Sequence, residues 1–253
     1  MSVLELQREV TYGPINSRRL GRSLGINLLP GGRKVCTFDC VYCQYGSAKA
    51  VSTPGAKTGF PSVETVLDKL EEAIRRQASP PDCLTFSGNG EPTLHPQFPE
   101  IAAEVRRLRD RMCPAARLAI LSNSTLVHRG EIRQAIAALD DPIMKLDAGD
   151  AITLERINRP AAGVAFDKIV DGLAALPRLI IQSMIISGEV ANAEGEALEG
   201  WLSAIAELSP VKVQVYSTER PVAEAGVHRV SKEAVDGLAR LAQERTGIPV
   251  AAY

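Results

Sequence analysis

Short apolar segments alternate with longer amphipathic segments along most of the chain. The apolar segments are rich in Val, Ile, Leu or Phe, as fully buried strands are. They predict strands over residues 25–29, 83–87, 118–122, 143–147, 179–186 and 211–216. The segments between them repeat apolar residues at helical spacing. They predict helices over residues 63–77, 98–111, 131–139, 166–176, 195–208 and 232–245.

The ends of two of these helices carry recognisable capping residues. Ser62 precedes the first helix, and its hydroxyl can accept a hydrogen bond from an unpaired backbone amide there. Ser231 stands in the same position before the last helix, and Gly247 predicts where that helix ends.

Strand–helix alternation of about six units implies parallel strands joined by right-handed crossovers. Six units are too few for a closed eight-stranded barrel, so we expect an α/β fold that is a partial (β/α)6 TIM-like barrel with parallel strands; a doubly wound sheet is the alternative. We expect residues 1–253 to form one domain. Its expected parts are an N-terminal extension over 1–24, a barrel core over 25–216 and a C-terminal segment over 217–253 with the closing helix. In either fold the chemistry gathers at the C-terminal strand ends.

Composition is that of an ordinary globular protein, with 45% hydrophobic residues and no apolar run long enough to span a membrane. The first residues include acids and lack the apolar core of a signal peptide, so we expect a cytoplasmic protein.

The net charge of −1 conceals an uneven distribution. Residues 1–60 contain eight Lys or Arg and three Asp or Glu, while the remainder contains twenty-one and twenty-seven. The early basic residues near the cysteines are Arg18, Arg19, Arg22, Arg33 and Lys34. They form either a solvated surface or a face toward an anionic cofactor, cluster or phosphate-bearing substrate. The net charge gives no support to broad nucleic-acid binding.

Three cysteines follow the first predicted strand: Cys36, Cys40 and Cys43, in the spacing Cys-x3-Cys-x2-Cys. Three thiolates on one loop can hold three irons of a 4Fe-4S cluster and leave the fourth iron open, whereas an electron-transfer cluster normally has four protein ligands. A zinc site usually pairs two short Cys or His segments, and a disulfide framework needs an even cysteine count and a secreted context. Both alternatives fit this chain less well. Cys83 and Cys113 stand apart and are not expected to be ligands.

The second predicted strand runs into the turn Gly88-Asn89-Gly90-Glu91-Pro92. Glycines at a strand end let the backbone approach a ligand closely, and bare carbonyls with a Glu side chain can bind an ammonium group. An ordinary strand-to-helix turn is the alternative interpretation.

With the cysteine loop after the first strand and the Gly-x-Gly-Glu-Pro turn after the second, the chain resembles the radical S-adenosylmethionine (SAM) superfamily. Residues 12–21, 23–30, 145–148, 158–160 and 220–221 are similar to a branch of compact iron–sulfur oxidoreductases related to wyosine-type tRNA-modifying enzymes. The resemblance implies that the open iron binds the methionine amino and carboxylate groups of SAM. It also implies reductive cleavage of SAM to a 5′-deoxyadenosyl radical, which takes a hydrogen atom from a substrate.

The resemblance assigns roles residue by residue. Cys36, Cys40 and Cys43 would be the metal ligands. The residues expected along SAM are Tyr42, Gly88, Asn89, Gly90, Glu91, Asn123, Asp147, Ser183 and Tyr216. Tyr42 could instead only shield the cluster, Asn123 and Asp147 could cap the following helices, and Ser183 could serve packing alone.

Three basic residues are further candidates. Lys145 lies in an apolar strand, so its ammonium must find a partner or a polar cavity. It is the candidate catalytic residue, with a structural or substrate-binding ion pair to Asp147 as the favoured alternative. Arg159 and Arg220 are candidates for binding a substrate carboxylate or phosphate, or form surface salt bridges.

The sequence thus predicts a radical SAM enzyme with a 4Fe-4S cluster and S-adenosyl-L-methionine. Its expected partners are an external electron donor and an unidentified substrate, with tRNA first and a peptide or protein second, and no membrane. The rival interpretations are a non-catalytic iron–sulfur electron-transfer or redox protein and a zinc-stabilised binding module.

Overall fold

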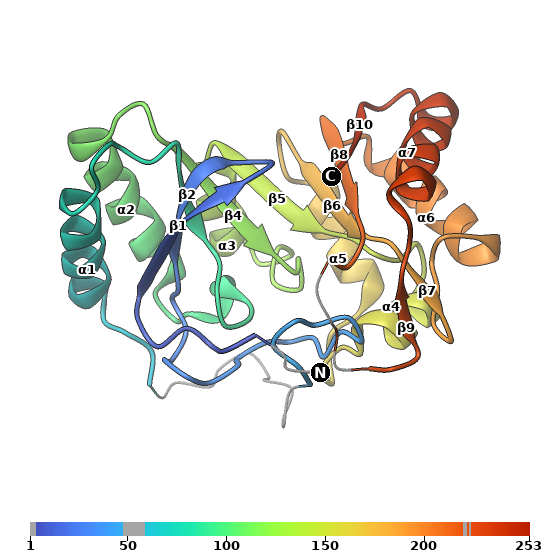
Figure 1. The fold of residues 1–253 in the computed structure, drawn as a ribbon, viewed down its shortest axis with the longest axis horizontal. Helices are drawn as coiled ribbons and strands as arrows, with labels where there is room; N and C mark the ends of the chain where they lie inside the picture. The colour runs from blue at the N-terminus through green and yellow to red at the C-terminus, as the bar shows by residue number, and fades with distance from the viewer. Residues whose placement is uncertain (1–3, 48–58, 220–221, 223) are drawn as a thin grey trace.

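The computed structural model describes residues 4–47, 59–219, 222 and 224–253 of the chain. Its main feature is an eight-stranded sheet in the order β1-β2-β3-β4-β5-β6-β8-β10 (Figure 1). The strands are β1 Thr11–Ser17, β2 Gly21–Ile26, β3 Cys83–Phe86, β4 Arg117–Ser122, β5 Asp141–Lys145, β6 Ile180–Met184, β8 Lys212–Tyr216 and β10 Val250–Ala252. All neighbours pair in parallel except β1 and β2, which form an antiparallel hairpin.

The six predicted parallel strands correspond to β2, β3, β4, β5, β6 and β8, and the expected α/β partial barrel is confirmed. Strand β2 begins four residues before the predicted start, at Gly21. The predicted strand over 179–186 is divided into β6, which ends at Met184, and the short strand β7 (Ile186–Gly188), which pairs with residues 227–229 in a separate two-stranded sheet. The amide of Ile185 makes the last hydrogen bond of the β6–β8 pairing, to the carbonyl of Tyr216 at 2.8 Å.

Helices cover the outer face of the curved sheet (Figure 1). They are α1 Val63–Arg75, α2 Phe98–Met112, α3 Gly130–Ala137, α5 Phe166–Ala174, α6 Gly195–Leu208 and α7 Lys232–Thr246. The predicted caps are confirmed, since the Ser62 hydroxyl accepts from the Thr65 amide and the Ser231 hydroxyl accepts from the Ala234 amide. Gly247 ends α7 in the left-handed region with φ of 71°. Between sheet and helices lies the main core, which includes Trp201 and Phe86.

Five elements were not predicted as strands or helices. They are β1, β10, the strand β9 (Val227–Arg229) that pairs with β7, the helix α4 (Ala151–Asn158) and the 3-10 turn Pro92–Leu94. Helix α4 follows β5 and carries the residues that pack behind the cysteine loop. Because this helix was not predicted, the sequence analysis did not place its residues beside the cysteine loop.

The β1–β2 hairpin forms one edge of the sheet, and its turn reaches over the inner face. Leu20, in its turn, packs against Cys83, Ala119 and Ile143, which point inward from β3, β4 and β5. The same turn reaches the last strands, since Arg18 forms an ion pair with Glu219 at 2.7 Å. The hairpin thereby connects the first and last strands of the partial barrel through side chains.

No helix in the described part of the chain is long and apolar enough to cross a lipid bilayer.

Candidate active site

A cavity of about 590 Å³ opens at the C-terminal ends of the parallel strands and extends along the inside of the sheet. It is bordered by the cysteine loop, the glycine-rich turn, the ends of β4, β5, β6 and β8, and the β1–β2 hairpin. This volume falls within the range of about 300–1,000 Å³ that is typical of small-molecule sites.

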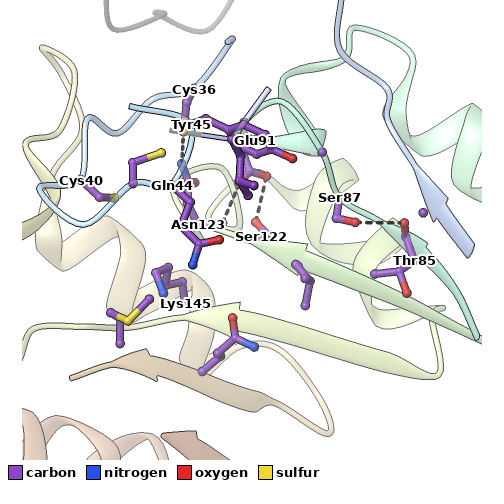
Figure 2. A pocket seen from close by; sticks show the side chains of 18 of the residues that line it. Cys36, Cys40, Gln44, Tyr45, Thr85, Ser87, Glu91, Ser122, Asn123 and Lys145 are labelled. Atoms are coloured by element: carbon purple, nitrogen blue, oxygen red, sulfur yellow. Dashed lines mark hydrogen bonds between the residues drawn. The ribbon is translucent and has the colours of Figure 1, made fainter. Parts of the chain in front are cut away.

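The cysteine loop is fixed by backbone pairing on both sides. Val35 pairs with Gly90 of the glycine-rich turn, and Phe38 pairs with Pro160 after α4. Amide side chains then contact two of the sulfurs, because Asn123 Nδ2 lies 3.5 Å from Cys36 Sγ and Asn158 Nδ2 lies 3.3 Å from Cys40 Sγ. Figure 2 shows Asn123 extending from the sheet toward Cys36.

Burial of these thiols affects how they could bind a metal. Burial raises the pKa of Cys36, and it raises the pKa of Cys40 to about 11, so thiolates there need a bound cation to offset their charge. In the described residues no three Cys, His, Asp or Glu side chains converge on one point, as ligands of one zinc ion would. In a 4Fe-4S cluster each thiolate binds a different iron, so such convergence is not required.

Lys34 adds a positive charge beside the cysteine loop. Its ammonium donates to the Gly46 carbonyl at 2.8 Å and lies 3.4 Å from Asp39. Burial would lower the pKa of Lys34, but Cys43, Cys36 and Asp39 outweigh that effect and raise it. The ammonium therefore stays charged and offsets thiolate charge.

The glycine-rich turn follows β3 and requires its two glycines. Gly88 and Gly90 have φ of 135° and 142°, which L residues rarely adopt. A Cβ on Gly90 would lie 1.9 Å from the carbonyl oxygen of Val35, so the turn approaches the cysteine loop too closely for any side chain. Both glycines line the cavity.

Asn89 and Glu91 occupy the same turn but differ in what their side chains reach. The Asn89 side chain is fully buried, exchanges two 2.7 Å hydrogen bonds with the backbone of Gln7 and is not part of the cavity lining. Glu91 lines the cavity, yet its carboxylate already accepts from Thr93, Ser122 and the Asn123 amide. Burial raises the pKa of Glu91, and these donors oppose the effect. Glu91 thus fixes the turn to the end of β4, as Figure 2 shows.

Asp147 is a buried carboxylate that joins three elements around the cavity wall. It accepts hydrogen bonds from the Tyr42 hydroxyl, from Asn158 Nδ2 at 2.8 Å and from the Met184 amide at 2.8 Å. Asp147 also forms an ion pair with Lys145, in which Lys145 Nζ lies 3.3 Å from Asp147 Oδ1. Asp147 does not cap a helix, because the N-cap of α4 is Asp150.

Lys145 extends from the end of β5 into the cavity wall (Figure 2). Its Nζ donates to the Tyr216 hydroxyl at 3.1 Å and lies 5.1 Å from the centre of the Tyr42 ring. Burial alone would lower the pKa of Lys145, but Asp147, Tyr216 and Cys40 raise it above its usual value. The ion pair with Asp147 matches the favoured alternative of the sequence analysis and favours the ammonium form of Lys145, while a catalytic role of Lys145 stays a prediction.

The structure brings Cys36, Cys40, Cys43, Tyr42, Gly88, Gly90, Glu91, Asn123, Lys145 and Tyr216 to one cavity. It places other candidates elsewhere. Ser183 donates to the Leu146 carbonyl and accepts from Trp201, so its hydroxyl serves packing. Arg159 binds Glu224 through both guanidinium ends, outside the cavity lining. Arg220 lies outside the described residues.

Several residues at the site were not singled out in the sequence. Asn158 contacts Cys40, Tyr42 and Asp147, and Gln182 accepts from the Tyr216 hydroxyl at 3.2 Å. Asn158 belongs to residues 158–160, one of the segments that carried the family resemblance, and that membership could have identified it as a site residue. Gln182 is a polar residue inside an otherwise apolar predicted strand, which is a comparable signal.

The family model described as the Radical SAM superfamily matches residues 34–192, well over half of the chain. The chain belongs to the radical SAM superfamily. It is therefore an enzyme of the radical SAM type, and the family implies a 4Fe-4S cluster and SAM as its cofactors.

Similar curated proteins include a Methanocaldococcus jannaschii UPF0026 protein, 35% identical over 221 residues, which cover 85% of this chain and 65% of that protein. A Synechocystis UPF0026 protein is 32% identical over 83% of this chain and 76% of its own length. A Brachyspira hyodysenteriae protein named GTPase Obg is 30% identical over 85% of this chain. The match spans only 31% of that protein, so its name describes that protein and not this chain.

Solved structures share the fold at low sequence identity. A TYW1 structure with a lysine–pyruvate adduct has a TM-score of 0.63 at 16% identity, covering 88% of this chain and 73% of its own. A radical SAM methyltransferase from Sphaerobacter thermophilus has a TM-score of 0.68 at 14% identity, covering 91% and 65%. Streptococcus suis SuiB bound to its precursor peptide SuiA has a TM-score of 0.61 at 11% identity, covering 99% and 50%.

Proposed function

We propose that Cys36, Cys40 and Cys43 hold a 4Fe-4S cluster with one open iron, and that the enzyme abstracts a hydrogen atom from a substrate bound in the adjoining cavity. The observation that carries this proposal is the single cavity shared by the three cysteines and the glycine-rich turn. When bound, the cluster supplies one electron to SAM, which gives methionine and a 5′-deoxyadenosyl radical.

The protein's own residues have positioning roles in this proposal. Gly88 and Gly90 present bare backbone to the methionine end of SAM, while Glu91 holds that turn against β4. Asn123 and Asn158 donate toward sulfurs of Cys36 and Cys40, which stabilises their thiolates. Tyr42 and Tyr216 supply aromatic surface to the cavity, which suits the adenine base and excludes water from the reaction.

We propose tRNA as the first candidate substrate. The sequence resembles the branch related to wyosine-type enzymes, and the fold resembles TYW1. A peptide or protein is the second candidate, favoured by the fold likeness to SuiB, which was solved with a precursor peptide. An external electron donor is part of the proposal in both cases.

The cluster and cofactor are tested by anaerobic reconstitution of the wild-type protein, Cys40→Ala and the control Cys113→Ala, whose cysteine lies buried beyond α2. We expect wild type and Cys113→Ala to bind iron and to change their electron paramagnetic resonance spectra when SAM is added. Cys40→Ala should lose the cluster. An unchanged wild-type spectrum with SAM, or full iron retention by Cys40→Ala, would contradict the proposal.

The substrate class is tested by mass spectrometry for 5′-deoxyadenosine after incubation with a tRNA fraction or a peptide fraction. Filter binding to tRNA across a salt series complements it, because phosphate contacts make the affinity fall steeply with salt. Stimulation by peptides alone, with salt-independent tRNA binding, would reverse the order of the candidates.

A further inference from the structure

Arg19, in the turn between β1 and β2, lines the cavity and has no polar partner for its buried Nη1 atom. Among the residues that the structure describes, no ion pair includes this guanidinium, whereas its neighbour Arg18 is paired with Glu219. A buried donor without an acceptor is unfavourable, and more so when it is charged. Such a cost is recovered when a ligand supplies the acceptor.

Two aromatic rings hold the Arg19 guanidinium in place. Its central carbon lies 4.8 Å from the centre of the Tyr216 ring and 5.9 Å from that of Tyr253. Stacking on rings uses the faces of the guanidinium and leaves the N–H donors on its edge available. A stacked guanidinium with a free edge is preorganised to bind a planar or tetrahedral oxyanion with two parallel hydrogen bonds.

The surrounding charges favour an anion at this position. Lys145 lies against the same Tyr216 ring at 5.3 Å, and Lys212 lies 5.6 Å from the centre of the Tyr253 ring. The nearby carboxylates are already engaged, since Asp147 pairs with Lys145 and Glu219 pairs with Arg18. With Lys145 and Arg18 paired, Arg19 and Lys212 are the basic side chains here that form no ion pair with any described residue, so this end of the cavity favours an anion.

We propose that Arg19 forms a subsite for an oxyanion of the substrate, a carboxylate or a phosphate, at the hairpin end of the cavity. This inference rests on the proposed function, because it assumes that the substrate enters the cavity beside SAM. It assigns a specific role to Arg19, one of the five basic residues that stand near the cysteines in the sequence. The carboxylate of SAM is assigned to the open iron by the family resemblance, so the Arg19 subsite is left for the substrate.

The test is calorimetric titration of the anaerobically reconstituted protein at low salt with orthophosphate and, separately, acetate. The variants are Arg19→Gln, Arg19→Lys and the control Arg22→Gln, which removes one positive charge from the same hairpin. The Arg22 guanidinium donates hydrogen bonds to Ser79, and Arg22 is not part of the cavity lining.

We expect wild type and Arg22→Gln to bind one of the two anions alike. Arg19→Gln should lose at least tenfold in affinity. Arg19→Lys should lose less affinity, because lysine keeps the positive charge but lacks the two parallel N–H donors of the guanidinium. Preference for orthophosphate indicates a phosphate-bearing substrate, and preference for acetate indicates a carboxylate. SAM should leave the anion affinity unchanged.

Equal anion affinity in wild type and Arg19→Gln, or no binding of either anion to wild type, would overturn the subsite. Competition between SAM and the anion would also overturn it, by assigning Arg19 to the cofactor. If Arg19→Gln fails to fold, Arg19→Lys and the arginine side-chain NMR signals of the wild-type protein give the same decision.

Cleavage of SAM without substrate, measured in parallel on the same samples, separates the two proposals. Intact cleavage with no anion binding refutes the subsite alone. Absent cleavage in every sample refutes the proposed function and leaves the anion result to stand by itself.

Discussion

Replacing Gly90 by Ala tests whether close contact between the glycine-rich turn and the cysteine loop holds the site together. The new Cβ would lie 1.9 Å from the Val35 oxygen, 2.6 Å from the Val35 carbonyl carbon and 3.1 Å from Cys36 Cβ. The first two contacts involve backbone, which cannot rotate away as a flexible side chain can. One of the two segments must therefore move.

The expected cost follows from what that movement breaks. Two hydrogen bonds flank the contact, from the Val35 amide to the Asn89 carbonyl at 2.9 Å and from the Glu91 amide to the Val35 carbonyl at 3.0 Å. Losing both costs about 1–3 kcal/mol. The φ of 142° adds about 1–3 kcal/mol for a non-glycine residue. We expect the free energy of unfolding to fall by roughly 2–6 kcal/mol.

Urea unfolding and the iron content after anaerobic reconstitution measure the two consequences. Gly247→Ala is the matched control, because Gly247 has φ of 71° but a Cβ there meets no atom within 4 Å. We expect the control to lose about 1–2 kcal/mol and keep its iron. If Gly90→Ala unfolds within 1 kcal/mol of the control and binds iron equally well, the reasoning is wrong.

Two further predictions concern buried polar groups. Asp147→Asn removes the carboxylate paired with Lys145, so an uncompensated buried charge should lower the unfolding free energy by about 3–5 kcal/mol in urea titrations; a loss below about 1 kcal/mol would contradict the ion pair. Burial lowers the pKa of His95, whose Nδ1 accepts from the Gln97 amide at 3.0 Å. The folded state therefore favours neutral His95, and this contribution is fully present above the unfolded pKa of about 6.5 and lost as pH falls through the folded value. Urea unfolding across this range should show a steeper acid-side loss for wild type than for His95→Gln, and equal slopes would refute the assignment.

Much of the architecture could be predicted because buried parallel strands leave a strong local pattern. The six segments rich in Val, Ile, Leu or Phe correspond to six neighbouring parallel strands, and Ser62, Ser231 and Gly247 cap helices as expected. The hairpin strand β1 escaped prediction because Gly13 and Pro14 interrupt it and most of its side chains are exposed. Helix α4 has no clear apolar face in its sequence, because Ile152 is exposed although it is apolar.

The site was predicted only as far as motifs and strand ends determine it. Cys36, Cys40, Cys43, Gly88 and Gly90 lie together as expected, because consecutive parallel strands end at the same edge of the sheet. Whether a polar side chain faces the cavity depends on tertiary contacts that no local pattern encodes. Asn89 and Ser183 are turned to structural partners for this reason. The division into an extension, a core and a C-terminal segment remains a prediction.

The β1–β2 hairpin has a consequence for the order in which this protein takes shape during synthesis. Asn123 and Asn158, which support the cysteine loop, leave the ribosome long before Tyr216 and Tyr253, on which Arg19 rests. The hairpin end of the cavity is completed only after β10, the last strand, has been synthesised.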